Sequence, residues 1–490
     1  MRIVVCVKQA ASGEINPFDA CAYEAALRIK DAQVLLLSMG PEKSKDFLLE
    51  LTRLGAQKAY LLCDKTFAGA DTLATAYVLS LAVQKLQPDL VICGRQTVDG
   101  DTGQTGPSLA RAAGLSLITN VMEINNTEDR LVCATRDAEQ CTAEYPALVT
   151  VERIHQLRLP SIRSKRGEVV LWDAAALQAD VNRCGTKGSP TKVLQTFQNE
   201  EGKRKCQFVE AAMLESLIAQ GLSKEKQRIL PTQREDAKLK KVWIVGKKCR
   251  EMAESISDDI TLIPKSNTDD DAFITRFVEQ IKEQNPSAIL WDSDPWSKKI
   301  APQVAALLKT GLCADCTALE TDGEHLYMYR PAFSGNVIAK IACETRPQMA
   351  TVRTLAEGSA DVICAIGRGA KEAQAAITSY VEQKNSRNTQ VRFETAASRG
   401  AVDLEMLPYL KQVGLTGKRV SPAVYIAIGI SGAVHHIAGM QQSGTVIAIN
   451  PNRNAPIFDY ADYGIVATAE DVFESNQTVQ ASTERIYYEF

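Results

Sequence analysis

Long apolar runs are missing from this 490-residue sequence, and so is any excess of basic charge. No stretch reaches the roughly 18 to 20 consecutive apolar residues that a membrane-spanning helix requires. Lysine and arginine number 56 against 59 aspartates and glutamates, a formal net charge of −3. We therefore expect neither membrane insertion nor a nucleic-acid partner, which usually requires clustered basic charge. The first apolar run is also too short for a signal-peptide core, so we expect a cytoplasmic protein.

Histidine is scarce, with four residues in the whole chain. We therefore expect neither a metal site nor a hydrolytic triad. The 13 cysteines lack the spacing of a disulfide framework, and most lie in apolar runs, so we expect reduced core thiols. Cys313 and Cys316 have the spacing of a redox or zinc pair, but no second pair follows at ligand distance. Core thiols are the favoured interpretation, and a redox or metal role is the alternative.

Short apolar runs alternate with helical patterns from the first residues onward. Continuous runs of this kind suit strands that are buried on both faces of a parallel sheet. The expected strands are 3–7, 34–37, 59–62, 90–93 and 147–151, and the expected helices are 19–30, 43–54, 72–86 and 107–113. This alternation predicts a doubly wound α/β domain.

The same alternation begins again after a polar stretch, 223–240, which we interpret as a linker. The expected elements here are strands 242–245 and 288–291 and helices 271–284 and 300–309. Pro107 and Gly114 in the first half match Pro302 and Gly311 in the second, which indicates two copies of one α/β unit. Chance similarity between two βα units is the alternative.

A third region has glycine-rich strand ends, where an open parallel sheet usually binds ligands. Its expected strands are 362–366, 424–429 and 445–450, and its expected helix is 371–383. The turn around Arg368 suits a phosphate or is a plain tight turn, whereas Ser431 and Gly432 open a helix whose dipole favours an anion. A protonated His436 would stabilise negative charge on a reduced flavin; ordinary packing contacts are the alternative.

A polar, glycine-rich loop, 94–106, separates a strand from a helix in the first half. Its amides and hydroxyls suit a nucleotide phosphate, and a solvated loop is the alternative.

These motifs resemble those of the electron-transfer flavoproteins, with a β-like part followed by an α-like part in one chain. The resemblance rests on Asn16-Pro17-Phe18-Asp19, Gly188-Ser189-Pro190-Thr191, Arg330-Pro331-Ala332-Phe333, Arg346-Pro347-Gln348-Met349 and the run 398–464. It implies an α/β fold of three domains: two related doubly wound parallel-sheet domains of the adenine-nucleotide hydrolase-like type and a C-terminal Rossmann-like FAD-binding domain. The implied segments are a β-like domain 1–195, a β C-terminal arm 196–222 that packs on the FAD domain, the fusion linker 223–240, an α-like domain 241–357 and the FAD-binding domain 358–490.

The resemblance also implies a redox FAD in the C-terminal domain, with no residue in an acid–base role. The implied contacts are Arg368, Ser398, Arg399, Gln412, Val413, Gly414, Thr416, Gly417, Ser431, Gly432, His436 and Asn450. Among them, Arg399, Thr416 and His436 would tune the flavin potential. Leu415 stands where the family usually has glutamine, and Thr468-Ala469 replaces a common aspartate.

A second nucleotide is implied in the β-like domain. Its implied contacts are Cys6, Asn16, Met39, Asp71, Thr72, Asp99, Asp101, Thr102, Gln104 and Thr105. The run from Asp71 to Thr75 resembles the members with two FADs, so FAD is favoured over AMP. Only six residues separate Gln9 from Asn16, a shorter excursion than the family usually has, and this departure disfavours NADH docking.

The function implied is a soluble electron carrier that exchanges electrons with a flavin dehydrogenase, such as an acyl-CoA dehydrogenase of fatty acid β-oxidation. The expected acceptor is open, with ferredoxin or flavodoxin as candidates. The alternative is an electron-bifurcating NADH oxidoreductase with two FADs, and only that alternative makes the chain an NADH-oxidising enzyme. A non-redox nucleotide sensor is a third hypothesis. The FAD domain is expected to swivel about hinges at 195–202 and 355–358.

Overall fold

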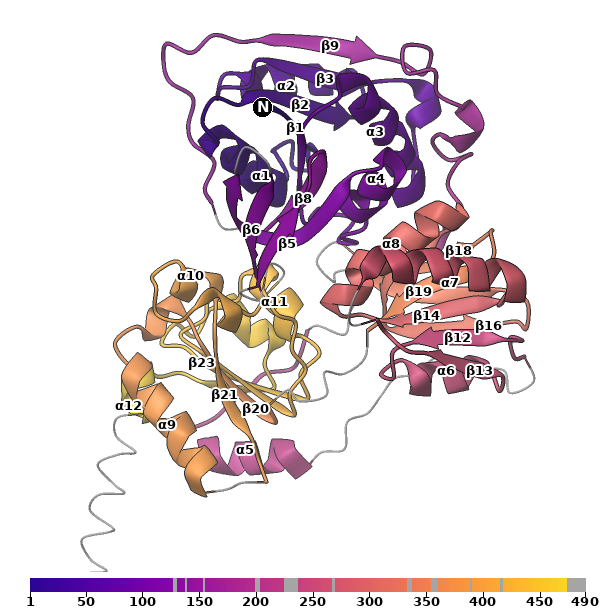
Figure 1. Cartoon of the computed structure of the whole chain (residues 1–490). Helices are drawn as coiled ribbons and strands as arrows, with labels where there is room; N and C mark the ends of the chain where they lie inside the picture. The colour runs from indigo at the N-terminus through magenta and orange to yellow at the C-terminus, as the bar shows by residue number, and fades with distance from the viewer. Residues whose placement is uncertain are drawn as a thin grey trace, which may run out of the picture. The chain divides into compact units, whose positions relative to one another are not determined.

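The computed structural model describes residues 1–126, 130–136, 139–152, 155–198, 203–223, 237–266, 269–332, 337–353, 360–387, 390–414 and 417–473. These residues form two compact units (Figure 1). Among the described residues, the first unit combines 1–197 with 237–332 and 337–353, and the second combines 198 and 203–223 with 360–473.

A nine-stranded sheet forms the N-terminal half of the first unit, in the order β7-β6-β5-β8-β4-β1-β2-β3-β9. Its parallel strands are β1 (Arg2–Cys6), β2 (Gln33–Met39), β3 (Lys58–Leu62), β4 (Leu90–Gly94), β8 (Ala147–Val151) and β9 (Glu168–Trp172). Helices α1 (Pro17–Arg28) and α2 (Ser44–Thr52) pack on one face, and α3 (Thr72–Leu86) and α4 (Thr105–Ala113) pack on the other. The predicted doubly wound α/β arrangement is confirmed.

A five-stranded sheet in the same unit repeats this topology, in the order β13-β12-β14-β19-β15. Its strands are β12 (Val242–Val245), β13 (Ile260–Ile263), β14 (Ala288–Asp292), β15 (Leu312–Cys316) and β19 (Gln348–Val352). Helix α6 (Arg250–Ile256) covers one face, while α7 (Asp270–Gln284) and α8 (Pro295–Leu308) cover the other. The order matches β2-β1-β4-β8-β5 of the larger sheet, so the chain contains two copies of one βα design.

The residue that corresponds to Gly114 is Lys309, which corrects the expected match with Gly311. Each is the left-handed C-cap of its helix, α4 or α8. The next residue makes the same bond in both copies: the Leu115 amide donates to the Ala110 carbonyl, and the Thr310 amide donates to the Ala305 carbonyl. The start expected for α8 at Ile300 is also wrong, because α8 begins at Pro295 and the Asp294 side chain caps it by accepting from the Ser297 amide.

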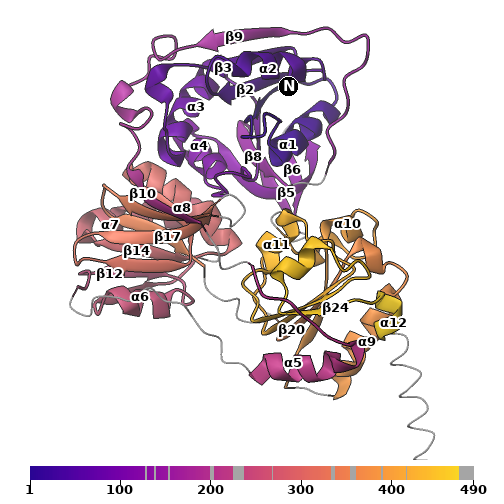
Figure 2. The ribbon, with the colours of Figure 1, turned by 180° about the vertical axis from the view of Figure 1, so that it is seen from behind.

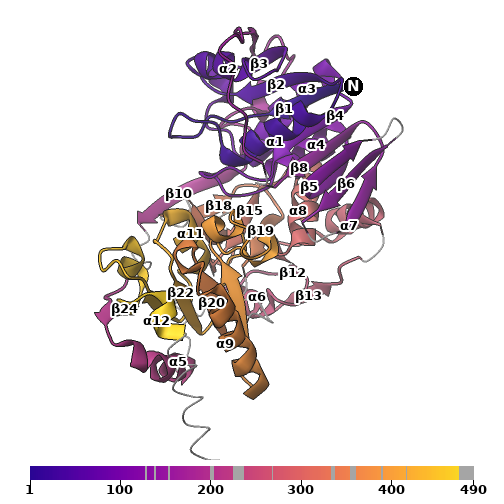
Figure 3. The same ribbon diagram turned by 90° about the vertical axis from the view of Figure 1, so that its left-hand side faces the viewer.

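Antiparallel pairs follow the parallel strands in both halves of this unit, and the apolar runs did not predict them: β5 pairs in parallel with β8 but antiparallel with β6. Strands β5 (Ser116–Asn126), β6 (Leu131–Thr135) and β7 (Gln140–Ala143) form a hairpin ribbon, of which Figure 3 shows β5 and β6 side by side. A separate four-stranded sheet joins β10 (Thr191–Gln198) to β18 (Val337–Cys343), β17 (Leu326–Ala332) and β16 (Ala318–Thr321). Strands β16 to β18 mix buried and half-buried positions and therefore lack continuous apolar runs.

The second unit holds a six-stranded parallel sheet, in the order β11-β24-β23-β22-β20-β21. Its strands are β20 (Val362–Ile366), β21 (Phe393–Ala397), β22 (Val424–Ile428), β23 (Thr445–Ile449), β24 (Tyr463–Ile465) and β11 (Gln207–Phe208). Helices α5 (Leu214–Ser223), α9 (Gln374–Arg387) and α12 (Ala469–Phe473) pack in one cluster on one face (Figure 2). Helix α11 (Val434–Met440) packs on the other face, while α10 (Arg399–Val402) follows β21. The expected β C-terminal arm is 196–222, and its described part from residue 203 onward supplies the edge strand β11 and nearly all of helix α5 to this unit.

Candidate functional site

The carboxyl edge of the nine-stranded sheet gathers the residues predicted for the second nucleotide. Strands β2 and β3 follow on one side of β1, whereas β4 lies on its other side, so the chain reverses direction between β1 and β4. Open α/β sheets bind ligands at such a switch point. Cys6 and Met39 end β1 and β2, and Asn16, Asp71 and Gln104 precede α1, α3 and α4.

Asn16 anchors the glycine-rich loop to this edge. Its side-chain amide donates to the Gln96 carbonyl at 2.9 Å, and its oxygen accepts from the Val98 amide at 3.2 Å. The loop also bonds within itself, where Gln96 Nε2 donates to Asp101 Oδ1 at 2.5 Å. The loop is therefore built by a buried asparagine rather than left in solvent.

Other expected contacts already have partners in the chain. The Asp71 carboxylate accepts from the Ala74 amide at 3.0 Å and from the Thr191 hydroxyl at 2.6 Å. The Gln104 side chain accepts from Thr72 Oγ1 at 2.9 Å and donates to the Leu312 carbonyl at 3.1 Å. Asp71 and Gln104 thus join segments of the first unit. The Lys8 ammonium donates to Asp99 at 2.7 Å, whereas Thr102 and Thr105 lie at the start of α4.

Asp19, which was part of a quoted motif but not among the predicted nucleotide contacts, lies buried at the same edge. Its carboxylate accepts from the Lys8 amide at 2.8 Å. Burial raises the pKa of Asp19 to about 7, although the hydrogen bonds of Asn16 and Lys8 oppose this shift. A β-carbon at Gly94 would lie 2.4 Å from the Asp19 carboxylate, so only glycine fits there. A raised carboxyl pKa beside a polar loop is typical of a functional site.

At the equivalent place, the carboxyl edge of the five-stranded sheet is filled by the chain's own side chains. We call it the filled edge, and the carboxyl edge of the nine-stranded sheet the open edge. Gly94 pairs with Val151, and its counterpart Asp292 pairs with Val352 in the same way. The buried Asp292 carboxylate accepts from the Cys249 amide at 3.0 Å and from Lys265 Nζ at 3.0 Å. Burial opposes the charge of Lys265, but its hydrogen bonds with Asp294 and Asp292 raise its pKa. An internal ion pair thus takes the place that the polar loop has in the other copy.

The carboxyl edge of the second unit's sheet brings together the residues predicted for the redox FAD. Arg368 follows β20, Ser398 and Arg399 follow β21, and Ser431 and Asn450 follow β22 and β23. The Arg368 side chain is exposed. Ser398 caps α10, and Arg399 Nε donates to Asp403 at 2.8 Å.

Asn450 joins two loops of this edge. Its amide nitrogen donates to the Ile430 carbonyl at 3.0 Å, and its oxygen accepts from the Asn452 amide at 2.9 Å. Backbone also packs closely here, because a β-carbon at Gly432 would lie 2.2 Å from the Ile457 nitrogen. The strand ends therefore form a tight cradle of main chain.

The turn that begins at Gln412 adds to this edge. The Val413 amide donates to the Ala397 carbonyl at 2.8 Å, and the Lys418 amide donates to the Gln412 carbonyl at 2.7 Å. Gly417 packs on that carbonyl, and Gly414 packs on α11. Thr416 and Leu415 lie outside the described residues.

His436 is buried behind this turn. Its Nε2 is 2.9 Å from the Tyr425 hydroxyl, and its Nδ1 has no hydrogen-bond partner among the described residues. Burial lowers the pKa of His436 to about 4, and the nearby Val413 backbone opposes this shift only in part. Without a bound anion the imidazole is therefore neutral at pH 7. The buried, unpartnered nitrogen and the main-chain cradle fit a polar ligand such as a flavin.

Two family models match the chain. The electron transfer flavoprotein domain matches residues 3–177 and 264–383, and the electron transfer flavoprotein FAD-binding domain matches residues 358–441. The first match alone covers more than half of the sequence. The chain belongs to the electron transfer flavoprotein family.

Curated relatives divide between the two subunits of such flavoproteins. The N-terminal part is 40% identical over 235 residues to the electron transfer flavoprotein subunit beta of Megasphaera elsdenii, which covers 40% of this chain and 87% of the relative. It is 36% identical over 262 residues to Protein FixA of Azorhizobium caulinodans, which covers 45% of this chain and 93% of the relative. The subunit alpha of Thermoanaerobacterium thermosaccharolyticum is 38% identical over 240 residues, or 41% of this chain and 73% of the relative.

The flavoprotein therefore joins a β-like and an α-like part in one chain, as the resemblance implied, and its C-terminal region binds FAD. Among the described residues, no helix is long and apolar enough to span a membrane, and no group of three metal-ligating side chains is present. All 13 cysteines are free thiols.

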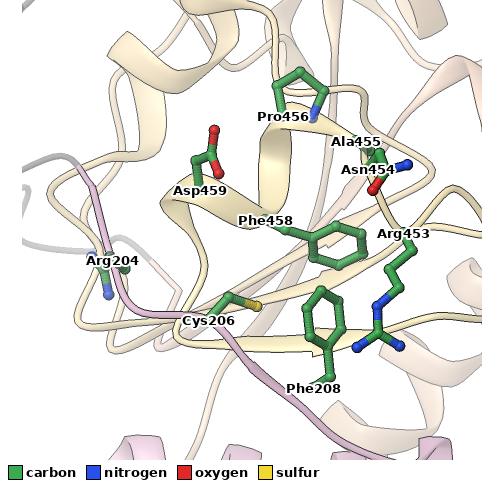
Figure 4. A pocket seen from close by; sticks show the side chains of 9 residues that line it. All are labelled: Arg204, Cys206, Phe208, Arg453, Asn454, Ala455, Pro456, Phe458 and Asp459. Carbon is green, nitrogen blue, oxygen red and sulfur yellow. The ribbon is translucent and has the colours of Figure 1, made fainter.

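A separate cavity of about 400 Å³ lies in the second unit, between the arm and the β23–β24 connection (Figure 4). Arg453 stands over the Phe208 ring at 4.3 Å, and Phe208 meets Phe458 edge-on with ring centres 5.1 Å apart. Arg204 also lines the cavity, but its guanidinium already donates to the Gly444 and Ser443 carbonyls. The lining includes none of the residues expected to contact FAD, so this cavity is distinct from the cradle.

The segment 155–166 exposes two large apolar side chains. Leu159 is 89% exposed and Ile162 is 99% exposed. Arg158 precedes Leu159 in the chain. Its Nε and Nη2 each donate to the buried Glu24 carboxylate at 3.0 Å. Burial opposes this ionisation, yet the hydrogen bonds with Arg158 and Arg28 lower the pKa of Glu24 to about 2. The ion pair fixes the base of a segment whose tip faces solvent.

Proposed function

We propose that this flavoprotein carries electrons from a flavin dehydrogenase of the acyl-CoA dehydrogenase type, with FAD in the second unit's cradle as the redox group. The observation that carries the proposal is the convergence of Arg368, Ser398, Ser431 and the turn from Gln412 at one sheet edge. When bound, FAD supplies the electron chemistry. Arg368 and Arg399 supply positive charge, which favours the anionic reduced flavin.

The neutral His436 has a defined part in this proposal. Because its Nε2 is held by Tyr425, its Nδ1 is the atom left to interact with a ligand. Negative charge on reduced flavin would raise the histidine pKa from about 4, so flavin reduction should be coupled to proton uptake. Thr416 keeps its expected role near the flavin as part of the proposal.

A second nucleotide in the first unit completes the proposal, with FAD favoured over AMP. The polar loop anchored by Asn16 and the raised pKa of Asp19 support a ligand at that edge. Cys6, Met39, Asp99, Asp101, Thr102 and Thr105 are its proposed contacts. We assign a positioning role, without direct nucleotide contact, to Asp71, Thr72 and Gln104, because their side chains hold the loop and helices in place.

The bound-nucleotide inventory tests this arrangement. The purified chain is denatured, and released FAD and AMP are counted per polypeptide by chromatography. We expect Arg368→Ala to lower FAD in the second unit and leave the other nucleotide, and Asn16→Ala to do the reverse. Arg392→Ala, an exposed arginine paired with Glu394 in the second unit, is the matched control. A colourless protein would refute the carrier.

The proposed dehydrogenase contact is the tip of segment 155–166. Leu159 and Ile162 leave apolar surface in water, which a partner would bury, while the exposed Arg163 suits an acidic group beside it. Leu159→Ser should slow flavin reduction by the dehydrogenase at least tenfold while reduction by dithionite stays unchanged. Leu307→Ser, at a 42% exposed position in α8, is the control. Equal rates in both variants would place the contact elsewhere.

Electron bifurcation with NADH is the second candidate function, and the open edge at Asn16 is the observation that favours it. Two FADs per chain together with flavin bleaching by NADH would support it. One FAD with one AMP would exclude it and leave the simple carrier.

A further inference from the structure

Cys313 and Cys316 lie in β15 on either side of a β-bulge. In a regular strand, residues three apart point to opposite faces. Here the register against β19 shifts, so that Cys313 is opposite Ala350 and Cys316 is opposite Val352. Asp315 provides the extra residue with a φ of 54°. Both thiols therefore lie on one face of the sheet, in one buried cluster.

The fold does not need cysteine at these two places. The equivalent bulge in β5 sets Ile118 opposite Val149 and Val121 opposite Val151, with Asn120 at a φ of 58°. Ile118 and Val121 are buried together in their own cluster. Since aliphatic side chains fill this bulge in the other copy, the paired thiols bring a reactivity that packing does not require.

The surroundings give the two thiols different chemistry. The Cys316 thiol donates to the Cys313 carbonyl, with Sγ 3.9 Å from the oxygen. The hydrogen bond from Cys316, with the Arg330 charge, lowers the pKa of Cys313, whereas burial raises the pKa of Cys316. A thiol of lowered pKa beside a thiol of raised pKa is the arrangement of an attacking and a resolving cysteine.

We propose that Cys313 and Cys316 are a redox-active dithiol that closes to an intrachain disulfide when the chain meets a peroxide. The Cys313 thiolate attacks one peroxide oxygen, the O–O bond breaks, and a sulfenic acid and hydroxide form. The Cys316 sulfur then attacks the Cys313 sulfur, the S–O bond breaks, and the S–S bond forms. In total two thiols lose two electrons and two protons, and hydrogen peroxide becomes two waters.

The dithiol is connected to the polar loop of the N-terminal half. The carbonyl of Leu312, next to Cys313, accepts from Gln104 Nε2 at 3.1 Å. Arg330, whose charge acts on Cys313, donates to the Asp101 carbonyl at 3.3 Å. A disulfide draws the two sulfurs to about 2.05 Å, which displaces the bulge and these two contacts. Oxidation should therefore loosen the loop at Asp101 to Gln104.

Peptide mapping tests the dithiol in the full chain with its bound nucleotides. After hydrogen peroxide and alkylation, trypsin releases the peptide 310–340, whose only cysteines are Cys313 and Cys316. We expect this peptide to lose the mass of two hydrogens and to regain both alkylation sites after dithiothreitol. Cys313→Ala and Cys316→Ala should abolish the disulfide, whereas Cys249→Ala, a thiol of the same cluster, should leave it. Full alkylation of both cysteines, or a sulfinic acid at either, would overturn the proposal.

Amide hydrogen exchange tests the connection to the loop. Exchange in residues 101–105 should become at least threefold faster in the oxidised chain, while strand β2 stays unchanged. Cys316→Ala treated with peroxide should show no such change. A disulfide that leaves exchange in the loop unaltered would overturn the connection, and the peptide map would still decide the dithiol itself.

Discussion

The two copies of the βα design in the first unit differ at one strand end. In the nine-stranded sheet β4 ends at Gly94, and residues 95–104 form a polar loop before α4 begins. In the five-stranded sheet β14 ends at Asp292, and α8 begins at Pro295. Gly94 leaves room for the Asp19 carboxylate, whereas Asp292 fills the edge and binds Lys265.

This difference shows how one topology carries two roles. The same strand order produces the same switch point in both sheets, but a glycine and a loop keep one edge available for a ligand. An aspartate and a lysine turn the other edge into part of the protein's own interior. A fold therefore predicts where a ligand would bind, and the side chains at that place decide whether one does.

Replacing Asp292 in the filled edge should have the largest effect on stability. Asp292→Ala would leave Lys265 and the Cys249 amide without their buried partner, so we expect the free energy of unfolding to fall by about 3–5 kcal/mol. Urea unfolding of the purified chain measures this. Asp294→Ala, which removes a helix cap and a more exposed contact, should cost about 0.5–2 kcal/mol. Loss of nucleotide from the Asp292 variant while it is still folded would contradict the comparison.

Asp19, at the open edge, should make the free energy of unfolding depend on pH. Its folded pKa of about 7 lies above the ordinary value of 3.8, so the folded chain holds a proton that the unfolded chain releases between these values. The free energy of unfolding should therefore fall with rising pH in that window, by up to about 1.4 kcal/mol per pH unit, and level off above pH 7. Asp19→Asn should lack this slope. Denaturation at a series of pH values compares the two proteins, and parallel curves would count against the buried carboxyl.

Asn16→Ala should destabilise the polar loop at the open edge. Two hydrogen bonds to the loop are lost, one at the Gln96 carbonyl and one at the Val98 amide, with an expected cost of about 1–3 kcal/mol. Thermal unfolding measures the loss, and Asn182→Ala, at an exposed asparagine, provides the baseline. A variant as stable as the parent would mean that the loop does not depend on this anchor.

Lys8→Ala should have the smallest effect. Lys8 is about half exposed and bonds Asp99 at 2.7 Å, so its ion pair is screened by solvent. We expect a change of about 0.2–1 kcal/mol. Lys265→Ala, in the filled edge, should cost clearly more because Lys265 pairs with the buried Asp292. If Lys8→Ala and Lys265→Ala lost the same free energy of unfolding in urea, the two edges would differ less than their structures indicate.

The sequence predicted the parallel strands well. Strands at 147–151, 242–245 and 362–366 begin and end where the apolar runs predicted. Such runs are a local signal, because a strand buried on both faces must be apolar at every position. The strands of the antiparallel pairs, β5 to β7 and β16 to β18, gave no such signal, since only one of their faces is fully buried.

For the candidate sites, the sequence predicted which residues follow the ends of strands but not what their side chains contact. Arg368 and Ser431 follow strands that the apolar runs predicted, β20 and β22, so the sequence indicated the sheet edge at which they lie. Ser398 follows β21, a strand that the apolar runs did not predict. Their flavin contacts stay a prediction, as do the segment boundaries from 1–195 to 358–490. Asp19 was missed because its significance comes from burial beside Gly94, which no local pattern shows.

The sequence by itself determined the family, the alternation of strands and helices, and the paired cysteine spacing, because these depend on neighbouring residues. Only the tertiary structure decided that Asp292 meets Lys265, that Asn16 anchors a loop 80 positions away, and that a bulge sets Cys313 and Cys316 on one face. Those features depend on the register between strands and on burial. Both arise only when distant segments pack together.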